Sequence, residues 1–349
     1  MSSSSLRNLG ILALLLVGAV VVMEMRSTRQ PTSTGGLLFG DLKARLGEVD
    51  TVTITRAGDE VPTVLVAMDG RWRVSNRGNY PADPGTLRKV LLTMADAQII
   101  EAKTADPKHY GTLELNDPTS EAGQAVRVDL AGPELEYGLL IGKRQGEYRY
   151  VRTPGEAQTW LIDTDPAIPD EMRGWLARTI VDMDAADIER ISIRHADGEE
   201  ITTDRASREQ SDFDVLDIPE GRALRPSFVA NGIGNVLTGL ELEDVRPETA
   251  DPVSVTTEFE TFDGLTIAIR SMITEDGSWI AVHATSEDEA SNDAAGVINT
   301  RLQGWQYRVG DFQAGQLTQR WGDILELEDT VDKQPSSSET EAGGGKPDG

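Results

Sequence analysis

The sequence predicts an α+β fold, in which two tandem copies of a mostly antiparallel sheet-plus-helix unit follow an N-terminal transmembrane helix. Apolar and polar residues alternate along most of the chain, which is typical of half-buried strands. The same order of features occurs twice, which indicates an internal repeat. A short, uncharged apolar run near the N-terminus predicts the membrane helix. We expect the two units at residues 37–178 and 179–327.

The apolar run from Leu9 to Met23 carries no charge. At about 1.5 Å per residue it spans roughly 22 Å, which is less than the roughly 30 Å of a hydrocarbon core. Arg7 and Arg26 flank the run, and long basic side chains that reach the head groups make up such a difference. Because no small-x-small cleavage site follows, an uncleaved anchor over residues 1–25 is expected. A cleaved signal peptide is the alternative.

Two further segments are predicted to have no fold of their own. Residues 26–36 are rich in Ser, Thr, Gly and Pro, which indicates a flexible tether. Residues 328–349 combine serine and glycine runs with scattered acids, which is typical of a disordered tail. The folded body is therefore expected between these segments.

In the first unit, alternating apolar residues predict strands around residues 49–54, 64–68 and 72–74. Asp83 and Pro84 are typical of a helix start, because Asp caps the first turn and Pro suits the first helical position. A helix is therefore expected from this point. Its apolar face consists of Leu87, Val90, Leu91 and Met94.

The second unit repeats this order of features. An alternating strand is expected around residues 188–193, and Phe213 and Val215 take the places of Trp72 and Val74. A helical stretch with an apolar face is expected in the second unit as well, although two glycines weaken it. The tetrapeptide Thr-Ala-Asp-Pro occurs in both units, at 104–107 and at 249–252. The apolar residues of the helical stretch are Val229, Ile233, Val236 and Leu237, and its glycines are Gly232 and Gly234.

Charge and cysteine content exclude several classes of function. The formal net charge is −26, from 59 Asp and Glu against 33 Lys and Arg. Such a surface repels nucleic acid and anionic lipid head groups, so we expect no nucleic-acid partner. Cysteine is absent. This excludes disulfides, zinc-thiolate sites and thiol catalysis.

The histidines and acidic clusters do not predict a catalytic or metal site. No helical or hairpin spacing brings two of the histidines His109, His195 and His283 together, so we interpret them as exposed or core-edge residues. Calcium prefers oxygen ligands, but neither acidic cluster has the spacing of an EF-hand loop. We therefore interpret both clusters as solvated acids. The clusters are Asp182, Asp184 and Asp187, and Glu287, Asp288, Glu289 and Asp293.

Two glycine motifs also lack residues that phosphate binding or dinucleotide binding requires. Gly142-Lys143 is followed by Arg144, where a phosphate-binding loop needs Ser or Thr. Gly232-Ile233-Gly234 lacks the third glycine of a dinucleotide-binding motif. We therefore predict a protein that is not an enzyme, with no catalytic, cofactor-binding or metal-binding residues and no cofactor. The sequence does not identify binding residues.

Three motifs, together with the apolar N-terminal run, carry a family resemblance. They are Asn79-Tyr80-Pro81-Ala82-Asp83 before the predicted helix, the 104–107 tetrapeptide, and Ile141-Gly142-Lys143 at a strand end. Together they resemble bacterial members of the domain-of-unknown-function 4340 family. The likeness covers about residues 37–327. The second unit departs from it, because Pro219-Glu220-Gly221-Arg222 stands in place of the Tyr-Pro-Ala-Asp turn.

The resemblance implies a function without implying catalytic residues. Family members look like membrane-anchored proteins that are often encoded beside an ABC-type export system and a gliding-motility-type auxiliary protein. We therefore expect a non-enzymatic auxiliary or binding subunit of an ABC-type transport system. Its body would lie on the periplasmic side of the bacterial inner membrane, with a single pass through residues 9–23. The expected partners are the membrane and a transporter membrane subunit or auxiliary protein.

Two other classes of function stay open at this stage. One is an envelope hydrolase or glycan-modifying enzyme whose acidic residues converge only in the fold. The other is a periplasmic binding protein that signal cleavage releases from the membrane.

Overall fold

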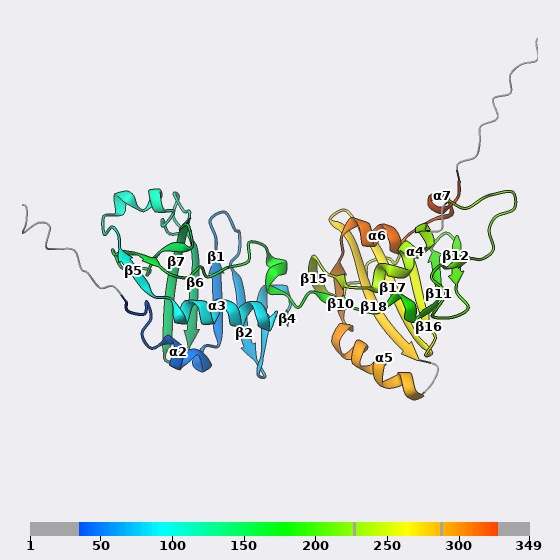
Figure 1. The fold of residues 1–349 in the computed structure, drawn as a ribbon, viewed down its shortest axis with the longest axis horizontal. Helices are drawn as coiled ribbons and strands as arrows, with labels where there is room; N and C mark the ends of the chain where they lie inside the picture. Colours follow the sequence, from blue (N-terminus) through cyan, green and yellow to red (C-terminus); the bar gives the residue numbers. More distant parts are fainter. Residues whose placement is uncertain (1–34, 226–227, 287–288, 327–349) are drawn as a thin grey trace, which may run out of the picture. The chain divides into compact units, whose positions relative to one another are not determined.

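The computed structural model of the protein describes residues 35–225, 228–286 and 289–326 (Figure 1). This part of the chain divides into two compact units. Unit 1 contains the described residues up to Ile180, with residues 241–249 and 304–308. Unit 2 contains the remaining described residues.

The first sheet has nine strands in the order β4-β3-β2-β1-β6-β7-β8-β9-β5, and every neighbouring pair is antiparallel. Alternate residues such as Val52, Ile54 and Leu65 are buried, which confirms the predicted strand pattern. The strands are β1 (Thr51–Thr55), β2 (Thr63–Met68), β3 (Arg71–Val74), β4 (Tyr80–Pro81), β5 (Ile99–Ala102), β6 (Val126–Gly132), β7 (Leu135–Gln145), β8 (Tyr148–Arg152) and β9 (Thr159–Ile162).

Helix α3 (Pro84–Asp96) crosses the first sheet, and the short helix α2 (Leu42–Arg45) packs on it (Figure 1). The side chain of Asp83 accepts a hydrogen bond of 2.5 Å from the backbone N–H of Thr86, so the predicted helix start is confirmed. Leu87, Val90, Leu91 and Met94 are buried and form the predicted apolar face.

The substitution Asp83→Ala is expected to lower the free energy of unfolding by about 1 kcal/mol, because it removes the side-chain cap of α3. Chemical denaturation measures this change. The matched control is Asp96→Ala at the other end of α3, where the carboxylate forms an exposed ion pair with Lys43. Such pairs contribute less than about 1 kcal/mol, with many near zero. Equal losses in the two variants would contradict the role of Asp83.

The second sheet has eight strands in the order β13-β12-β11-β16-β17-β18-β19-β15. Helix α5 packs mainly on β18, whereas α4 contacts β11 and α6 contacts β17. The strands are β11 (Ile188–His195), β12 (Glu200–Asp204), β13 (Asp214–Val215), β15 (Asp244–Pro247), β16 (Val255–Thr261), β17 (Leu265–Thr274), β18 (Gly277–Ser286) and β19 (Trp305–Arg308), and β10 (Thr179–Val181) pairs with β14 (Leu240–Glu241). The helices are α4 (Phe228–Gly234), α5 (Glu289–Leu302), α6 (Asp311–Leu317) and α7 (Trp321–Ile324).

The two large sheets have equivalent strand orders. Without its edge strand β4, the first sheet runs β3-β2-β1-β6-β7-β8-β9-β5. Each of these strands corresponds, in chain order, to one strand of the second sheet, from β13 at one edge to β15 at the other. In both sheets the first strand along the chain lies inside the sheet: β1 lies between β2 and β6, and β11 lies between β12 and β16. The boundaries predicted for the two repeats, at residues 178 and 179, stay a prediction.

The predicted α+β class with an N-terminal transmembrane helix was wrong. The described chain is mostly antiparallel sheet, with 38% strand and 24% helix. One reason is that the helical stretch predicted in the second unit is short. It consists of α4 and a single 3₁₀ turn, η7 (Asn235–Leu237). Gly232 and Gly234 lie inside α4, and glycine is a poor helix former.

None of the helices in the described ranges combines the length and the apolar character that crossing a membrane requires. The predicted membrane segment, residues 9–23, lies outside the described residues, and so does the predicted tail at 328–349. Of the predicted tether, Gly35 and Gly36 are described. Both form backbone hydrogen bonds with Ile99 of β5, at 3.3 and 2.9 Å.

Candidate functional site

A long connection between β5 and β6 is the most distinctive part of unit 1. Residues 103–125, here called the β5–β6 loop, contain only two single 3₁₀ turns, η3 (Pro107–His109) and η4 (Gly111–Leu113). Connections longer than about 12–15 residues without regular structure are uncommon in compact domains and are usually functional or disordered. This loop is held by many specific contacts, so it is an ordered element of unit 1.

The Thr-Ala-Asp-Pro tetrapeptide fixes the start of the loop. Thr104 is bound to β9, because the backbone N–H of Thr159 donates to its carbonyl at 2.9 Å and its own N–H donates to the Thr159 hydroxyl at 3.0 Å. The Asp106 carboxylate then accepts from the Lys108 N–H at 3.1 Å and caps η3. The tetrapeptide therefore has a structural role as an anchor.

The loop has a small apolar core of its own. The Tyr110 hydroxyl donates a 2.7 Å hydrogen bond to the carbonyl of Ala157, so the ring is fixed at both ends. Burial of such side chains stabilises the loop by roughly 1.5–3 kcal/mol for each large residue. The core consists of the buried residues Tyr110, Leu115, Ala125 and Leu140, with Leu113 and Tyr150 packed against them.

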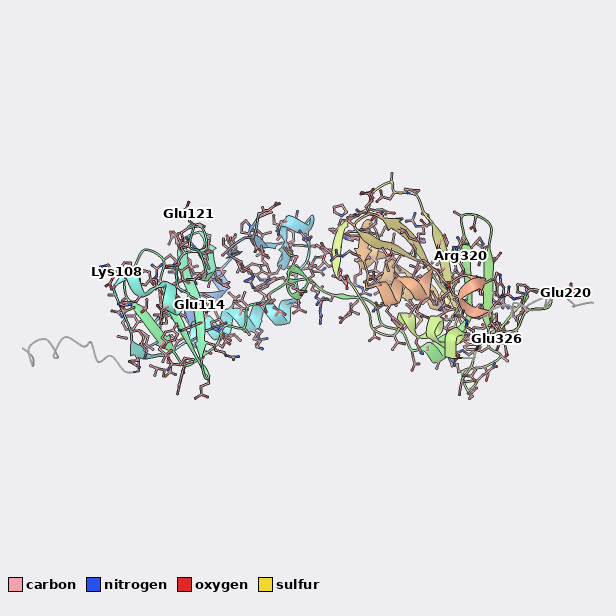
Figure 2. The ribbon with its side chains drawn as sticks, turned by 90° about the horizontal axis from the view of Figure 1, so that it is seen from above. Lys108, Glu114, Glu121, Glu220, Arg320 and Glu326 are labelled. Atoms are coloured by element: carbon pink, nitrogen blue, oxygen red, sulfur yellow. The ribbon has the colours of Figure 1, made fainter. Side chains whose placement is uncertain are left out.

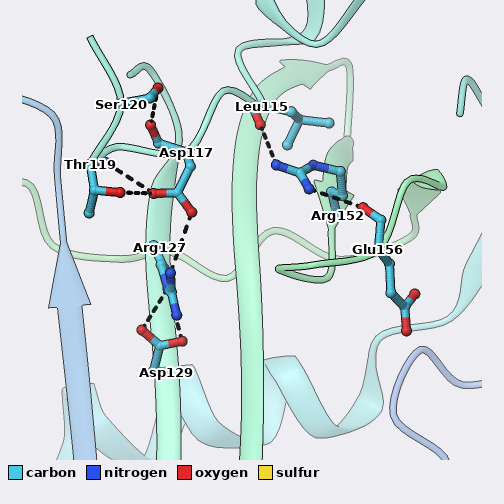
Figure 3. A network of polar contacts seen from close by, with 8 residues as sticks. All are labelled: Leu115, Asp117, Thr119, Ser120, Arg127, Asp129, Arg152 and Glu156. Carbon is cyan, nitrogen blue, oxygen red and sulfur yellow. Dashed lines mark hydrogen bonds and ion pairs between the residues drawn. The ribbon is translucent and has the colours of Figure 1, made fainter. Parts of the chain in front are cut away.

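Arg152 joins the loop to β8 through two backbone carbonyl groups, as Figure 3 shows. The residue is only 9% exposed. Its guanidinium donates to the carbonyl of Glu156 at 3.0 Å and to the carbonyl of Leu115 at 3.3 Å, and lies 4.4 Å from the centre of the Tyr110 ring. The buried guanidinium is thus stabilised by two carbonyl acceptors and the face of an aromatic ring, where a carboxylate would be the usual partner.

A second polar cluster holds the far end of the loop (Figure 3). Asp117 accepts hydrogen bonds from the N–H and the hydroxyl of Thr119, at 3.0 and 2.7 Å. It also forms an ion pair of 3.4 Å with Arg127, which in turn contacts Asp129 at 2.8 Å. Burial alone acts to raise the pKa of Asp117, but the bonds from Thr119 and the charge of Arg127 outweigh it, so its pKa is lowered.

Because the pKa of Asp117 is lower in the folded than in the unfolded chain, its ionised form stabilises the fold. This contribution is complete above the unfolded pKa of about 3.9 and is lost as the pH falls through the folded pKa. The substitution Asp117→Asn is expected to cost about 1–2 kcal/mol at pH 7. The difference from the wild type should shrink below about pH 4. Denaturation between pH 3 and 7 measures it, with Glu121→Gln as the control; a cost that is constant with pH would contradict this account.

The outer side of the loop carries exposed charged residues, three of which Figure 2 labels: Lys108, Glu114 and Glu121. Glu114 has a left-handed backbone conformation, with φ of 58°. This conformation costs a non-glycine residue roughly 1–2 kcal/mol, and such strain concentrates at functional sites. The loop thus presents charged side chains to solvent from a well-supported backbone.

Of the three histidines, His109 belongs to this loop and is exposed on η3. His195 is buried, with Nε2 at 3.0 Å from the carbonyl oxygen of Gln319, and His283 is exposed on β18. Within the described ranges, no group of three or more His, Asp or Glu residues is arranged to hold a metal ion.

The two acidic clusters have local structural roles where they are described. Asp184 caps a 3₁₀ turn by accepting from the Ala186 N–H at 2.9 Å. Asp187 forms an ion pair with Arg208 at 3.2 Å. In the other cluster, Glu289 begins helix α5, whereas residues 287–288 lie outside the described ranges.

The glycine motifs allow close packing. A Cβ atom on Gly142 would lie 2.2 Å from the carbonyl oxygen of Leu113, so only glycine lets η4 of the loop rest on β7. In unit 2, Gly234 packs against the ring of Phe213, where a Cβ atom would lie 2.3 Å from the ring. Gly142 lies within strand β7, and Gly234 is the last residue of helix α4.

A family model described as "Domain of unknown function (DUF4340)" matches residues 72–257. The chain belongs to this family. The comparison with curated proteins and the comparison with solved structures both found no match. The DUF4340 range contains all three motifs of the resemblance as well as the whole β5–β6 loop. The family resemblance inferred from the sequence is therefore confirmed, over a shorter range than residues 37–327.

Sequence reasoning found the motifs of this DUF4340 protein but missed the residues that join them. Arg152 and Tyr110 belong to no motif. The one available signal was an arginine directly after the apolar Val151 on a strand, at a position where a buried partner is needed. The Glu156 carbonyl is four residues away, but the Leu115 carbonyl is 37 residues away, so local spacing did not reveal the full set of partners.

Proposed function

We propose that this protein is a non-enzymatic auxiliary subunit of a bacterial ABC-type transport system, and that the β5–β6 loop contacts its partner subunit. In this proposal the body works on the extracytoplasmic side of the cytoplasmic membrane. The partner is a transporter membrane subunit or a second auxiliary protein.

The observation that carries the proposal is the set of specific contacts that hold the loop in one conformation. Binding costs free energy when loops and side chains must be ordered, so a surface that is already ordered binds more tightly. The loop is held in its conformation by hydrogen bonds of the side chains of Arg152, Asp117 and Tyr110. A long exposed connection that served only to join two strands would not need this support.

The charges on the loop support a protein partner. Lys108, Glu114 and Glu121 place both signs of charge on one exposed segment. Mixed charges favour a complementary protein surface, since they set orientation and suppress wrong partners. Membership of DUF4340 supports the assignment to a transport system through the associations that the family resemblance implies.

Co-purification from native membranes in a mild detergent tests the proposal. The wild-type protein is expected to retain a transporter component. The amount of transporter component that co-purifies with the variant Lys108→Glu/Glu114→Lys/Glu121→Lys should be at least about tenfold lower than with the wild type, because the variant reverses the charges at the contact. The matched control Arg71→Glu/Glu134→Lys/Glu147→Lys changes the net charge equally on exposed residues elsewhere in unit 1.

Two results would count against the proposal. If no transporter component accompanies the wild-type protein, the auxiliary role loses its basis. If the loop variant and the control retain the component equally, the role of the loop is wrong.

A further inference from the structure

A second feature of unit 1 is a polar cavity of about 220 Å³. It lies between the turn that follows β1 and the segment around the 3₁₀ turn η5 (Met172–Trp175). Its walls combine two partly buried arginines, four carboxylates and a few apolar side chains. The residues that matter for binding are Arg56, Asp59, Val61, Asp170, Met172 and Trp175.

Of the two arginines of this cavity, Arg77 is paired with Asp244 at 2.6 Å, so in the described part of the chain Arg56 is the one without an ion pair. Its Nη2 donates to the carbonyl of Pro169, whereas Nη1 is enclosed and has no hydrogen-bond partner among the described residues. An enclosed donor without a partner costs roughly 1–3 kcal/mol. Burial lowers the pKa of Arg56, and the charges of Asp170 and Asp59 oppose this effect only in part. The guanidinium thus has unused capacity for an acceptor.

The carboxylates of the rim leave that capacity unused. Asp59 and Asp170 are exposed and act on Arg56 through their charges, but within the described part of the chain neither lies at ion-pair distance from it. A third rim acid, Glu171, is already paired with Arg173 at 2.6 Å. The cavity therefore presents the donor-rich guanidinium of Arg56 together with exposed carboxylates at its rim.

We propose that this cavity binds a small zwitterion of amino-acid or short-peptide type. The ligand carboxylate accepts hydrogen bonds from the Arg56 guanidinium, and the ligand ammonium group lies beside Asp170 and Asp59. Met172 and Trp175 contact its apolar part. The volume of about 220 Å³ suits a ligand of the size of a dipeptide.

The charge pattern selects this class over simpler ions. A free phosphate or a dicarboxylate would meet Arg56 but would be repelled by Asp59 and Asp170. A simple amine would be attracted by the acids but would leave Arg56 without an acceptor. A ligand with both charges satisfies both groups, and each contact is a charge-assisted hydrogen bond. The residues of the cavity are separate from the β5–β6 loop, so this proposal stands apart from the partner-binding role.

Titration of the full-length protein with three probes tests the proposal. The probes are L-alanyl-L-alanine, its N-acetyl form without the ammonium group, and its C-terminal amide without the carboxylate. Calorimetry and NMR shifts of the Trp175 indole report binding. The free dipeptide should bind with a Kd in the millimolar range or below, and each blocked form at least tenfold more weakly.

Variants assign the two charges. Arg56→Gln should bind the free dipeptide no better than the wild type binds the amide, and Asp170→Asn no better than the wild type binds the N-acetyl form. Arg71→Gln, which changes an exposed arginine outside the cavity, should bind as the wild type does. Circular dichroism checks that each variant is folded; if Arg56→Gln is not, Arg56→Lys replaces it and should weaken binding severalfold. Equal binding of all three probes to the wild type, or no binding of any, would overturn the proposal.

Discussion

The substitution Gly142→Ala is expected to lower the free energy of unfolding by about 3 kcal/mol and to loosen the β5–β6 loop. A Cβ atom here would lie 2.2 Å from the carbonyl oxygen of Leu113 and 2.9 Å from the Leu115 side chain. Since a backbone carbonyl cannot rotate away as a side chain can, the loop has to move off β7. Chemical denaturation measures the loss of stability, and hydrogen exchange of residues 103–125 measures the loosening.

The matched control for this change is Gly47→Ala. No atom lies within 4 Å of a Cβ atom at Gly47, so the added methyl group meets open space. The expected change in stability is within about 0.5 kcal/mol. If Gly142→Ala were as stable as Gly47→Ala, the packing of the loop on β7 would be wrong.

The substitution Arg152→Ala is expected to cost about 3 kcal/mol as well. It leaves the carbonyls of Leu115 and Glu156 without their donors and removes the cation from the Tyr110 ring. The buried Leu115 carbonyl without a donor costs roughly 1–3 kcal/mol, the part-buried Glu156 carbonyl costs less, and the lost ring contact adds about 1 kcal/mol. Denaturation measures the total, and hydrogen exchange should show the loss of protection concentrated in the loop.

Two comparisons separate this role from a general effect of charge. Arg144→Ala removes an arginine that is 61% exposed and paired with Asp165, and should cost less than about 1 kcal/mol. Arg152→Lys keeps the charge but not the forked geometry, so it should recover only part of the stability. Full recovery by lysine, or protection of the loop in Arg152→Ala, would contradict the account.

Local signals in the sequence were sufficient where one short segment determines the structure. Asp83 followed by Pro84 predicted the start of α3, because the cap and the first helical position both depend on neighbouring residues. The alternating strands β1 to β3 were predicted for the same reason. The structure of these elements is determined by residues that are only a few positions apart.

Helix α5 shows where such reasoning was insufficient. The cluster of Glu287, Asp288, Glu289 and Asp293 was interpreted as solvated acids and no helix was predicted there, yet helix α5 begins at Glu289. Its position depends on Asn299, whose side chain accepts from the Ala284 N–H at 2.8 Å and donates to the Ala284 carbonyl at 2.7 Å. Asn299 thus satisfies backbone groups of β18 as a neighbouring strand would, and no local pattern predicts this.

The candidate site was predicted in pieces only. The motifs at 104–107 and 141–143 were recognised in the sequence. Their contact was not predicted: the β5–β6 loop, which begins with the first motif, packs against Gly142 of the second. That contact depends on the sheet, which brings β7 under the loop. The role of Arg152 likewise depends on two carbonyls that the chain order keeps separate.

The central claim is that the β5–β6 loop is the partner-binding surface, and site-specific photo-crosslinking in native membranes tests it most directly. A photoreactive residue is placed at Glu121 on the loop, or at Glu147, an exposed position in the β7–β8 turn of unit 1. We predict a crosslink to a transporter subunit from position 121 and none from position 147. Crosslinks of equal strength from both positions, or a crosslink from position 147 alone, would contradict the account.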